Sequence, residues 1–133
     1  MTNKLVLIRG IPGSGKSTIA RQYFSDCIHL EADMYFISPQ GDYVYDPSRI
    51  KQAHAWCFES AKIFLNNKKD VVVSNTFTTH KEINPYIQYA SNNNIPYVVF
   101  RTRQNYGSIH SVPADIIDKM RNRFQDIEKE VLW

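Results

Sequence analysis

The feature that most restricts the fold is the segment Gly10–Thr18, which reads GIPGSGKST. It satisfies the pattern G-x-x-x-x-G-K-[ST], in which a glycine-rich loop joins a buried strand to a helix. Residues 5–8 before it form a short apolar run, and residues 18–24 carry apolar or aromatic side chains at helical spacing. The sequence therefore predicts a strand, a phosphate-binding loop and a helix, in that order.

The residue types in this loop match the needs of a bound nucleoside triphosphate. Glycines let the backbone N–H groups point at phosphates, and the helix start adds further donors and a positive dipole end. Lys16 would reach the β- and γ-phosphates, and the Ser17 hydroxyl would hold Mg²⁺. ATP and Mg²⁺ are thus the predicted ligands. The residues predicted to bind the nucleotide are Gly10, Pro12, Gly13, Ser14, Gly15, Lys16, Ser17 and Thr18.

Composition is compatible with a single domain over residues 1–133. A chain of 133 residues can bury about two thirds of its unfolded surface. The formal net charge of +3 permits a phosphorylated or nucleic-acid substrate without requiring one. The two cysteines form no CxxC pattern and predict buried free thiols, and no apolar run approaches membrane-spanning length. We therefore expect a cytoplasmic protein (or one in the host cytoplasm, if phage-encoded), and the oligomeric state stays open.

Asp33 is the first candidate for a catalytic acid or base. Residues 27–31 are expected to form the second strand, and ligands of open α/β sheets bind at the carboxyl ends of the strands, so Asp33 should face the loop. A carboxylate there can accept the proton of an attacking hydroxyl or help to hold Mg²⁺, although a helix cap or turn is an alternative role. Glu31 lies on the same face of the strand and is the second candidate, with a structural role as its alternative.

Aromatic side chains gather in and around the next loop, residues 36–47, which is rich in turn residues. They are Tyr35, Phe36, Tyr43 and Tyr45. Beside an active crevice, such a cluster can stack on a base or sugar. The alternative is that these rings only pack the loop onto the edge of the sheet.

The remaining chain alternates helices and strands, with helices expected from Ser48 to about residue 67 and over 80–92. The third strand is expected over residues 70–74 and the fourth over 95–100. Asn75 and Thr76 follow the third strand and can bind a phosphate or sugar hydroxyl, or cap the next helix. No acid directly follows that strand, which favours a small kinase over a mechanical or hydrolysing NTPase.

A final helix is expected to begin near Pro113, after a lid segment at about residues 103–112. A basic residue in such a segment can neutralise the charge on a transferring phosphoryl group. The candidates for this lid arginine are Arg101, Arg103, Arg121 and Arg123. Any one of these arginines, taken alone, is more often a solvated surface charge.

Taken together, these motifs resemble the 5′-kinase domain of phage polynucleotide kinases, and still more the short P-loop ATPase or kinase-like proteins of that group. The resemblance covers nearly the whole chain. The motifs that carry it are the loop GIPGSGKST, Asp33-x-Tyr35, Gly41-x-Tyr43 with Tyr45, Ala53-His54-x-Trp56, Ser74-Asn75-Thr76, and His110-x-Val112-Pro113 with Met120.

The resemblance implies that Lys16 and Ser17 handle ATP and Mg²⁺, that Asp33 activates the acceptor hydroxyl, and that Arg103 is the lid arginine. It also shows three departures. Phe36 stands where the phage enzymes have an arginine that grips the 3′-phosphate of the nucleic acid. Asn75 replaces an acid after the third strand, and Gly107 replaces a second lid arginine. The changes at Phe36 and Gly107 remove expected contacts to nucleic acid.

We therefore expect a three-layer α/β P-loop kinase fold with about four mostly parallel strands in the order 2-3-1-4. The first functional hypothesis is ATP-dependent phosphoryl transfer to a hydroxyl, with the 5′-end of a polynucleotide as acceptor. Lys16, Asp33 and Arg103 would be catalytic, and Tyr35, Asn75 and Thr76 would bind the acceptor. The second hypothesis is a kinase for a nucleoside or another small molecule. The third is an ATP-binding interaction module with little turnover.

Overall fold

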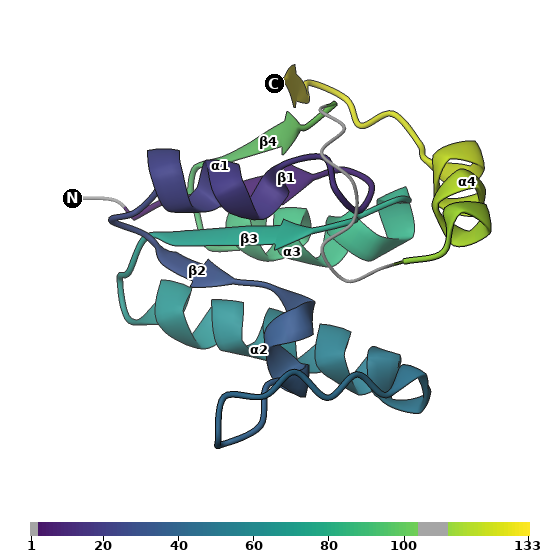
Figure 1. Cartoon of the computed structure of the whole chain (residues 1–133). Coiled ribbons are helices and arrows are strands. Elements are labelled where there is room, and N and C mark those ends of the chain that lie inside the picture. The colour runs from purple at the N-terminus through teal and green to yellow at the C-terminus, as the bar shows by residue number, and fades with distance from the viewer. Residues whose placement is uncertain (1–2, 104–111) are drawn as a thin grey trace.

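The computed structural model describes residues 3–103 and 112–133. Its centre is a five-stranded sheet with parallel pairing throughout, in the order β2-β3-β1-β4-β5 (Figure 1). Helical crossovers between the first four strands make such an arrangement natural. The strands are β1 (Leu5–Arg9), β2 (Ile28–Leu30), β3 (Val71–Asn75), β4 (Tyr97–Arg101) and β5 (Val131–Leu132).

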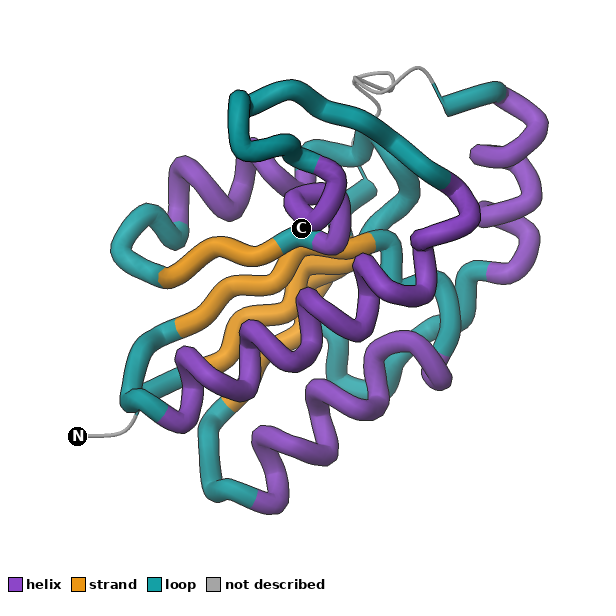
Figure 2. The backbone as a smooth tube through the Cα atoms, turned by 90° about the horizontal axis from the view of Figure 1, so that it is seen from below, coloured by secondary structure: helices purple, strands orange, loops and turns teal. Residues whose placement is uncertain are grey.

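Helices cover both faces of the sheet (Figures 1 and 2). One helix, α1, packs on one face, and α2 and α3 pack on the other. In Figure 1, α4 stands on the side toward which the strand arrows point. Across the described residues, no helix is long and apolar enough to span a membrane. The helices are α1 (Lys16–Tyr23), α2 (Ile50–Asn66), α3 (His80–Asn92) and α4 (Ala114–Arg123), with the short 3₁₀ helices η1 (Ala32–Phe36) and η2 (Pro47–Arg49).

Side-chain alternation along the strands produces two apolar cores. In β1, Leu5 and Leu7 join the core under α2 and α3, whereas Val6 and Ile8 join the core under α1. Successive side chains of a strand point to opposite faces of the sheet. The polar residues that end each strand follow the same alternation, which decides whether they turn toward α1 or toward α2 and α3.

The α/β fold and the order 2-3-1-4 of the first four strands are confirmed. Beyond them, Val131–Leu132 add a fifth strand that pairs with β4 and is too short for sequence periodicity to reveal. The helix expected from Ser48 begins as a 3₁₀ turn at Pro47, where the Asp46 carboxylate accepts from the Ser48 N–H group. The α-helical part starts at Ile50.

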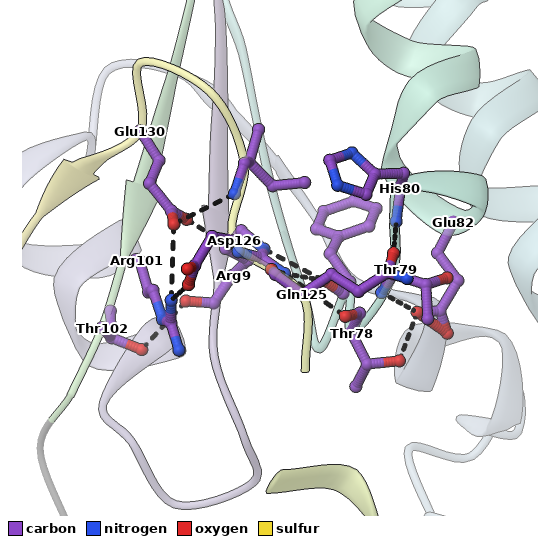
Figure 3. Close-up of polar contacts among 12 residues, drawn as sticks. Arg9, Thr78, Thr79, His80, Glu82, Arg101, Thr102, Gln125, Asp126 and Glu130 are labelled. Carbon is purple, nitrogen blue, oxygen red and sulfur yellow. Dashed lines mark hydrogen bonds and ion pairs between the residues drawn. The ribbon is translucent and has the colours of Figure 1, made fainter. Parts of the chain in front are cut away.

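Arg9, the largest fully buried side chain, ties the C-terminal segment to the sheet (Figure 3). Its guanidinium donates to the carbonyls of Phe77 (3.0 and 2.8 Å) and Gln125 (2.7 Å) and pairs with Glu130 at 2.7 Å. Burial lowers the pKa of Arg9, and the Glu130 carboxylate opposes that shift. Because breaking such a buried pair costs about 3–5 kcal/mol, residues 125–130 are held firmly against β1.

Arg101 at the end of β4 contributes to the same attachment. It pairs with Asp126 at 2.5 Å and Glu130 at 3.4 Å (Figure 3). The Phe124 ring has cationic groups against it from Arg9 (4.1 Å) and Arg101 (4.7 Å). Charged side chains at the ends of β1 and β4 therefore fix the segment that leads to β5.

Candidate active site at the carboxyl edge of the sheet

The loop between β1 and α1 has a backbone conformation that requires its glycines. Gly13 (φ 81°) and Gly15 (φ 92°) lie in the left-handed region, where a Cβ atom introduces strain. Gly15 is the N-cap of α1 and carries no side chain to cap the first N–H groups of the helix. These N–H groups and the helix dipole favour an anion at the start of α1.

Gly10 is needed because two hydroxyl groups meet beside it. The oxygens of Ser14 and Thr102 are hydrogen-bonded at 2.6 Å, and a Cβ atom on Gly10 would overlap both. The Thr102 N–H group donates to the carbonyl of Arg9 at 2.8 Å. The loop is thus joined to the end of β4, and any side chain at position 10 would separate the two.

Lys16 opens α1 and folds back over the loop. Its Nζ atom donates to the carbonyl of Ile11 at 3.0 Å. Burial lowers the pKa of Lys16 to about 8, while the charges of Glu31 and Asp33 act to raise it. The predicted phosphate-binding lysine therefore lies within electrostatic range of both candidate carboxylates.

The predicted metal ligand Ser17 lies in a polar network on the α1 face of the sheet. Its hydroxyl donates to Oε1 of Glu31, the carboxylate directly after β2. Ser74 Oγ donates to the same oxygen at 2.7 Å. His29 Nε2 lies 3.2 Å from that oxygen and 2.8 Å from Ser74 Oγ. The second candidate carboxylate is therefore the one in contact with Ser17.

Strand pairing explains how this network forms. In β2, Leu30 joins the α2 core, so His29 and Glu31 turn to the opposite face. β2 pairs with β3 in register, with His29 opposite Val72, which brings Glu31 alongside Ser74. The position after β3 holds no acid, and the neighbouring strand supplies a carboxylate to the same place.

The network also changes the acidity of Glu31. Burial alone would raise the pKa of this carboxyl, but hydrogen bonds from His29, Ser17 and Ser74 lower it to about 2. The folded protein therefore holds Glu31 ionised far below the pH at which an exposed glutamate takes up a proton.

This shift predicts acid sensitivity that originates at Glu31. The unfolded chain binds the proton more tightly than the folded one, so this contribution to stability is present above about pH 4.5 and is lost as the pH falls to about 2. Chemical denaturation of metal- and nucleotide-free protein should show that the free energy of unfolding decreases as the pH falls across this range. The decrease should be smaller in Glu31→Gln. The exposed control Glu128→Gln should follow the wild type, and parallel profiles for Glu31→Gln and wild type would contradict the assignment.

Asp33 lies in the first turn of η1, just beyond β2. The Tyr43 hydroxyl donates to its Oδ1 atom at 3.5 Å. Desolvation and the Asp33 charge raise the pKa of Tyr43 to about 12, so the phenol stays protonated and can donate. Asp33 thus contacts the aromatic loop through Tyr43, and its charge acts on Lys16.

Asn75 ends β3 and Thr76 directly follows it, and both residues make hydrogen bonds within the protein. The Asn75 side chain is buried, accepts from the Ala32 N–H group at 2.8 Å and donates to Cys57 Sγ at 3.6 Å. The Thr76 carbonyl accepts from Gly10 N–H at 3.3 Å. This geometry gives Asn75 a positioning role, because it fixes the residue directly before Asp33.

The aromatic residues divide into a packed and an exposed group. Tyr35 accepts from Arg49 at 2.6 Å and its ring lies 6.1 Å from Trp56, while Phe36 is buried. Tyr43 and Tyr45 remain 40% and 51% exposed. The packing interpretation therefore applies to Tyr35 and Phe36, and stacking on a base or sugar stays a prediction for Tyr43 and Tyr45.

The lid can be followed only at its margins, since most of the predicted segment 103–112, including Gly107 and His110, lies outside the described residues. Arg103 is exposed at the end of the first described range. Three other candidates contact the protein: Arg101 pairs with Asp126 and Glu130, Arg121 with Asp118 at 3.6 Å, and Arg123 donates to Thr78 at 3.2 Å.

The donor set around Ser17 suits Mg²⁺. A hydroxyl and the Glu31 carboxylate offer hard oxygen ligands, and Mg²⁺ is commonly held by one or two protein oxygens together with substrate phosphates and water. Among the described residues, no group of three or more His, Cys, Asp or Glu side chains forms a metal cluster. A magnesium site shared with a bound nucleotide is consistent with both observations.

The fold and this site define a class. A parallel sheet in an α/β fold places a glycine-rich loop, the start of α1 and two carboxylates at the carboxyl ends of its strands. The protein is a P-loop kinase-like domain, a fold that implies nucleotide binding.

The family model AAA_33, described as an AAA domain, matches residues 5–105, and the chain belongs to this family. It is 30% identical to human NEDD4-binding protein 2 over an alignment that covers 91% of this chain but only 8% of that protein. It is also 27% identical to the uncharacterized protein PM0531 of Pasteurella multocida, with 96% of this chain and 81% of that protein aligned. The chain thus spans a small part of the first relative.

Solved structures share the fold at low sequence identity. A putative kinase from Chloroflexus aurantiacus superimposes with a TM-score of 0.70 and 15% identity over 99% of this chain and 86% of that one. Kti12 of Chaetomium thermophilum, in complex with ADP-AlF3, gives 0.67 and 15% over 97% and 88%. A chain of the Pnkp1/Rnl/Hen1 complex gives 0.62 and 19% over 89% and 38%.

Proposed function

We propose that this domain transfers the γ-phosphoryl group of ATP to a hydroxyl group of a second substrate. The observation that carries the proposal is the position of Lys16, which opens a helix at the phosphate-binding loop and interacts with the charges of both Glu31 and Asp33. Phosphoryl transfer needs charge neutralisation and a proton acceptor. A cation and two carboxylates at the carboxyl ends of the strands can supply both.

The loop and Lys16 would bind and orient the triphosphate. N–H groups at the start of α1 would face the phosphates, and Lys16 would leave the Ile11 carbonyl for the β- and γ-phosphate oxygens. Ser17 and Glu31 would hold Mg²⁺, which when bound neutralises developing charge on the phosphates. Arg103 is our candidate for the lid arginine that adds positive charge from the opposite side.

Asp33 suits the role of general base better than Glu31. Oε1 of Glu31 accepts hydrogen bonds from two serines, and the pKa of this carboxyl is about 2, so it is a weak proton acceptor. Asp33 would accept the proton of the acceptor hydroxyl as its oxygen attacks the γ-phosphorus. The new O–P bond forms as the bond to the leaving ADP oxygen breaks.

Two acceptor classes have support. The resemblance to phage kinases favours a polynucleotide 5′-hydroxyl, and a Pnkp1 complex is among the structural neighbours. A small-molecule acceptor is favoured by Phe36, which is buried rather than presenting a charge to nucleic acid. A sugar kinase and a gluconokinase are also among the neighbours. An ATP-binding module with little turnover is the third hypothesis.

The test is transfer of labelled γ-phosphate to a panel of acceptors. It contains 5′-hydroxyl DNA and RNA oligomers, nucleosides, gluconate and water, each with ATP and Mg²⁺. We expect label on one hydroxyl class well above label released to water. Label on oligomers identifies a polynucleotide kinase, and label on nucleosides or gluconate identifies a small-molecule kinase. No label on any acceptor, with ATP binding confirmed by titration, would contradict transfer and leave the binding module.

A further inference from the structure

Tyr43 and Tyr45 form an exposed aromatic surface that the proposed reaction does not yet use. Their ring planes lie within 10° of each other with centroids 6.3 Å apart. The buried Phe36 ring makes T-shaped contacts with both tyrosine rings, at centroid distances of 6.3 Å to Tyr43 and 5.2 Å to Tyr45. The two rings therefore pack on buried Phe36, although each tyrosine keeps 40% or more of its surface exposed.

This tyrosine pair is connected to the site of phosphoryl transfer. The Tyr43 hydroxyl donates to Asp33, and the Asp33 charge acts on Lys16. A flat ligand lying against the pair would therefore be one side-chain contact away from the proposed general base. Large exposed aromatic surface beside a reaction centre is typical of stacking on planar groups.

Charge selects among planar ligands. Residues 32–49 contain three acidic side chains, Asp33, Asp42 and Asp46, and one basic side chain, Arg49. This stretch is net negative although the whole chain carries +3. Nucleic acids are bound mainly by lysines and arginines that neutralise phosphates. A neutral acceptor fits this surface better than a polyanion.

We propose that the Tyr43–Tyr45 pair is the acceptor platform of this domain and stacks on the nucleobase of a free nucleoside, placing a sugar hydroxyl at Asp33. The inference rests on the proposed phosphoryl transfer and names its acceptor. Aromatic stacking replaces the phosphate grip that Phe36 cannot supply, and it tolerates different bases because every base has a π-face.

Thymidine is the probe, because it avoids competition with adenine at the ATP site. Tyr45→Ala should raise the KM for thymidine roughly tenfold, which corresponds to about 1.4 kcal/mol of lost stacking, with little change in kcat or in the KM for ATP. Tyr45→Phe should restore the wild-type KM. The matched control is Tyr97→Ala, which removes a tyrosine that is 43% exposed at the opposite, amino end of the sheet.

Two further acceptors separate the possible results. Methyl 2-deoxyriboside, which lacks a base, should be a poor acceptor whose KM does not change in Tyr45→Ala. An equal loss for both acceptors, or no loss for thymidine, would overturn base stacking. A wild-type preference for 5′-hydroxyl oligothymidylate over thymidine would assign the platform to a polynucleotide end and overturn the free nucleoside.

Direct binding distinguishes failure of this inference from failure of the proposed function. Calorimetry with thymidine, in the presence of saturating ADP and Mg²⁺, needs no turnover. If no acceptor is labelled but thymidine binds and Tyr45→Ala weakens that binding, phosphoryl transfer fails and the stacking site is supported. If transfer to gluconate is observed and thymidine does not bind, transfer is supported and the stacking site is overturned.

Discussion

Lys16→Ala should reduce phosphoryl transfer by about 10²–10³-fold while the protein stays folded. The lysine is the cation that starts α1 and can reach the transferring phosphoryl group, and removing one preorganised donor to a developing charge costs about 10²–10³ in kcat. Loss of Lys16 also removes a positive charge that acts against the charges of Glu31 and Asp33, which further disfavours a polyphosphate. Initial rates with saturating ATP and the best acceptor from the panel measure the effect.

The matched control for this variant is Lys81→Ala, which removes an exposed lysine from α3. It should retain wild-type rates and a wild-type melting curve.

A second readout for Lys16→Ala is the pH dependence of ATP binding. Because the pKa of Lys16 is about 8, wild-type affinity should fall as the pH rises through 8, and this decline should be absent in Lys16→Ala. Unchanged turnover in the variant would remove the loop from the mechanism.

Local sequence was sufficient to predict much of the fold. The loop motif and the apolar runs around it determine β1, α1 and their connection, and the order of the first four strands follows from short right-handed crossovers. The C-terminal part was not predictable in the same way. β5 is two residues long, and its approach to β4 depends on the buried pair of Arg9 with Glu130, which are 121 positions apart in sequence.

The sequence singled out residues of the candidate site but not all of the contacts among them. Lys16, Ser17, Glu31 and Asp33 were each singled out from their positions after strands or in the loop. The contact between Ser17 and Glu31 was missed although the predicted strand order places β2 beside β3, because strand order alone does not give the register or show which side chains meet where the strands end. Period-two alternation offered a signal, since it places Glu31 on the opposite face from Leu30.

Asn75 makes contacts that its sequence position did not predict. Its place at the end of β3 suggested contact with an acceptor, yet Val71 and Val73 of the same strand lie in the α2 core, and alternation turns Asn75 to that side. There it holds the backbone of Ala32. Its influence on chemistry would therefore be exerted through the position of Asp33.

Asp33→Asn should lower kcat by roughly 10²-fold or more and leave ATP affinity nearly unchanged. The amide keeps the shape and the hydrogen-bond acceptor of the carboxylate but cannot take the proton of the acceptor hydroxyl, and general base catalysis contributes about 10²–10⁴-fold. The control is Asp26→Asn. The Asp26 side chain is exposed and lies near the amino end of β2, whereas Asp33 follows its carboxyl end. That variant should match the wild type.

Comparison with Glu31→Gln separates the two carboxylates. Glu31 contacts Ser17, so its variant should raise the Mg²⁺ concentration needed for half-maximal rate, whereas Asp33→Asn should not. Titration with a fluorescent ATP analogue at several Mg²⁺ concentrations measures both. If Asp33→Asn instead weakened binding of the nucleotide with its metal and Glu31→Gln did not, Asp33 would belong to the metal shell and the proton acceptor would have to be sought elsewhere. A loss confined to kcat leaves Asp33 as the group that meets the attacking hydroxyl, one hydrogen bond from Tyr43.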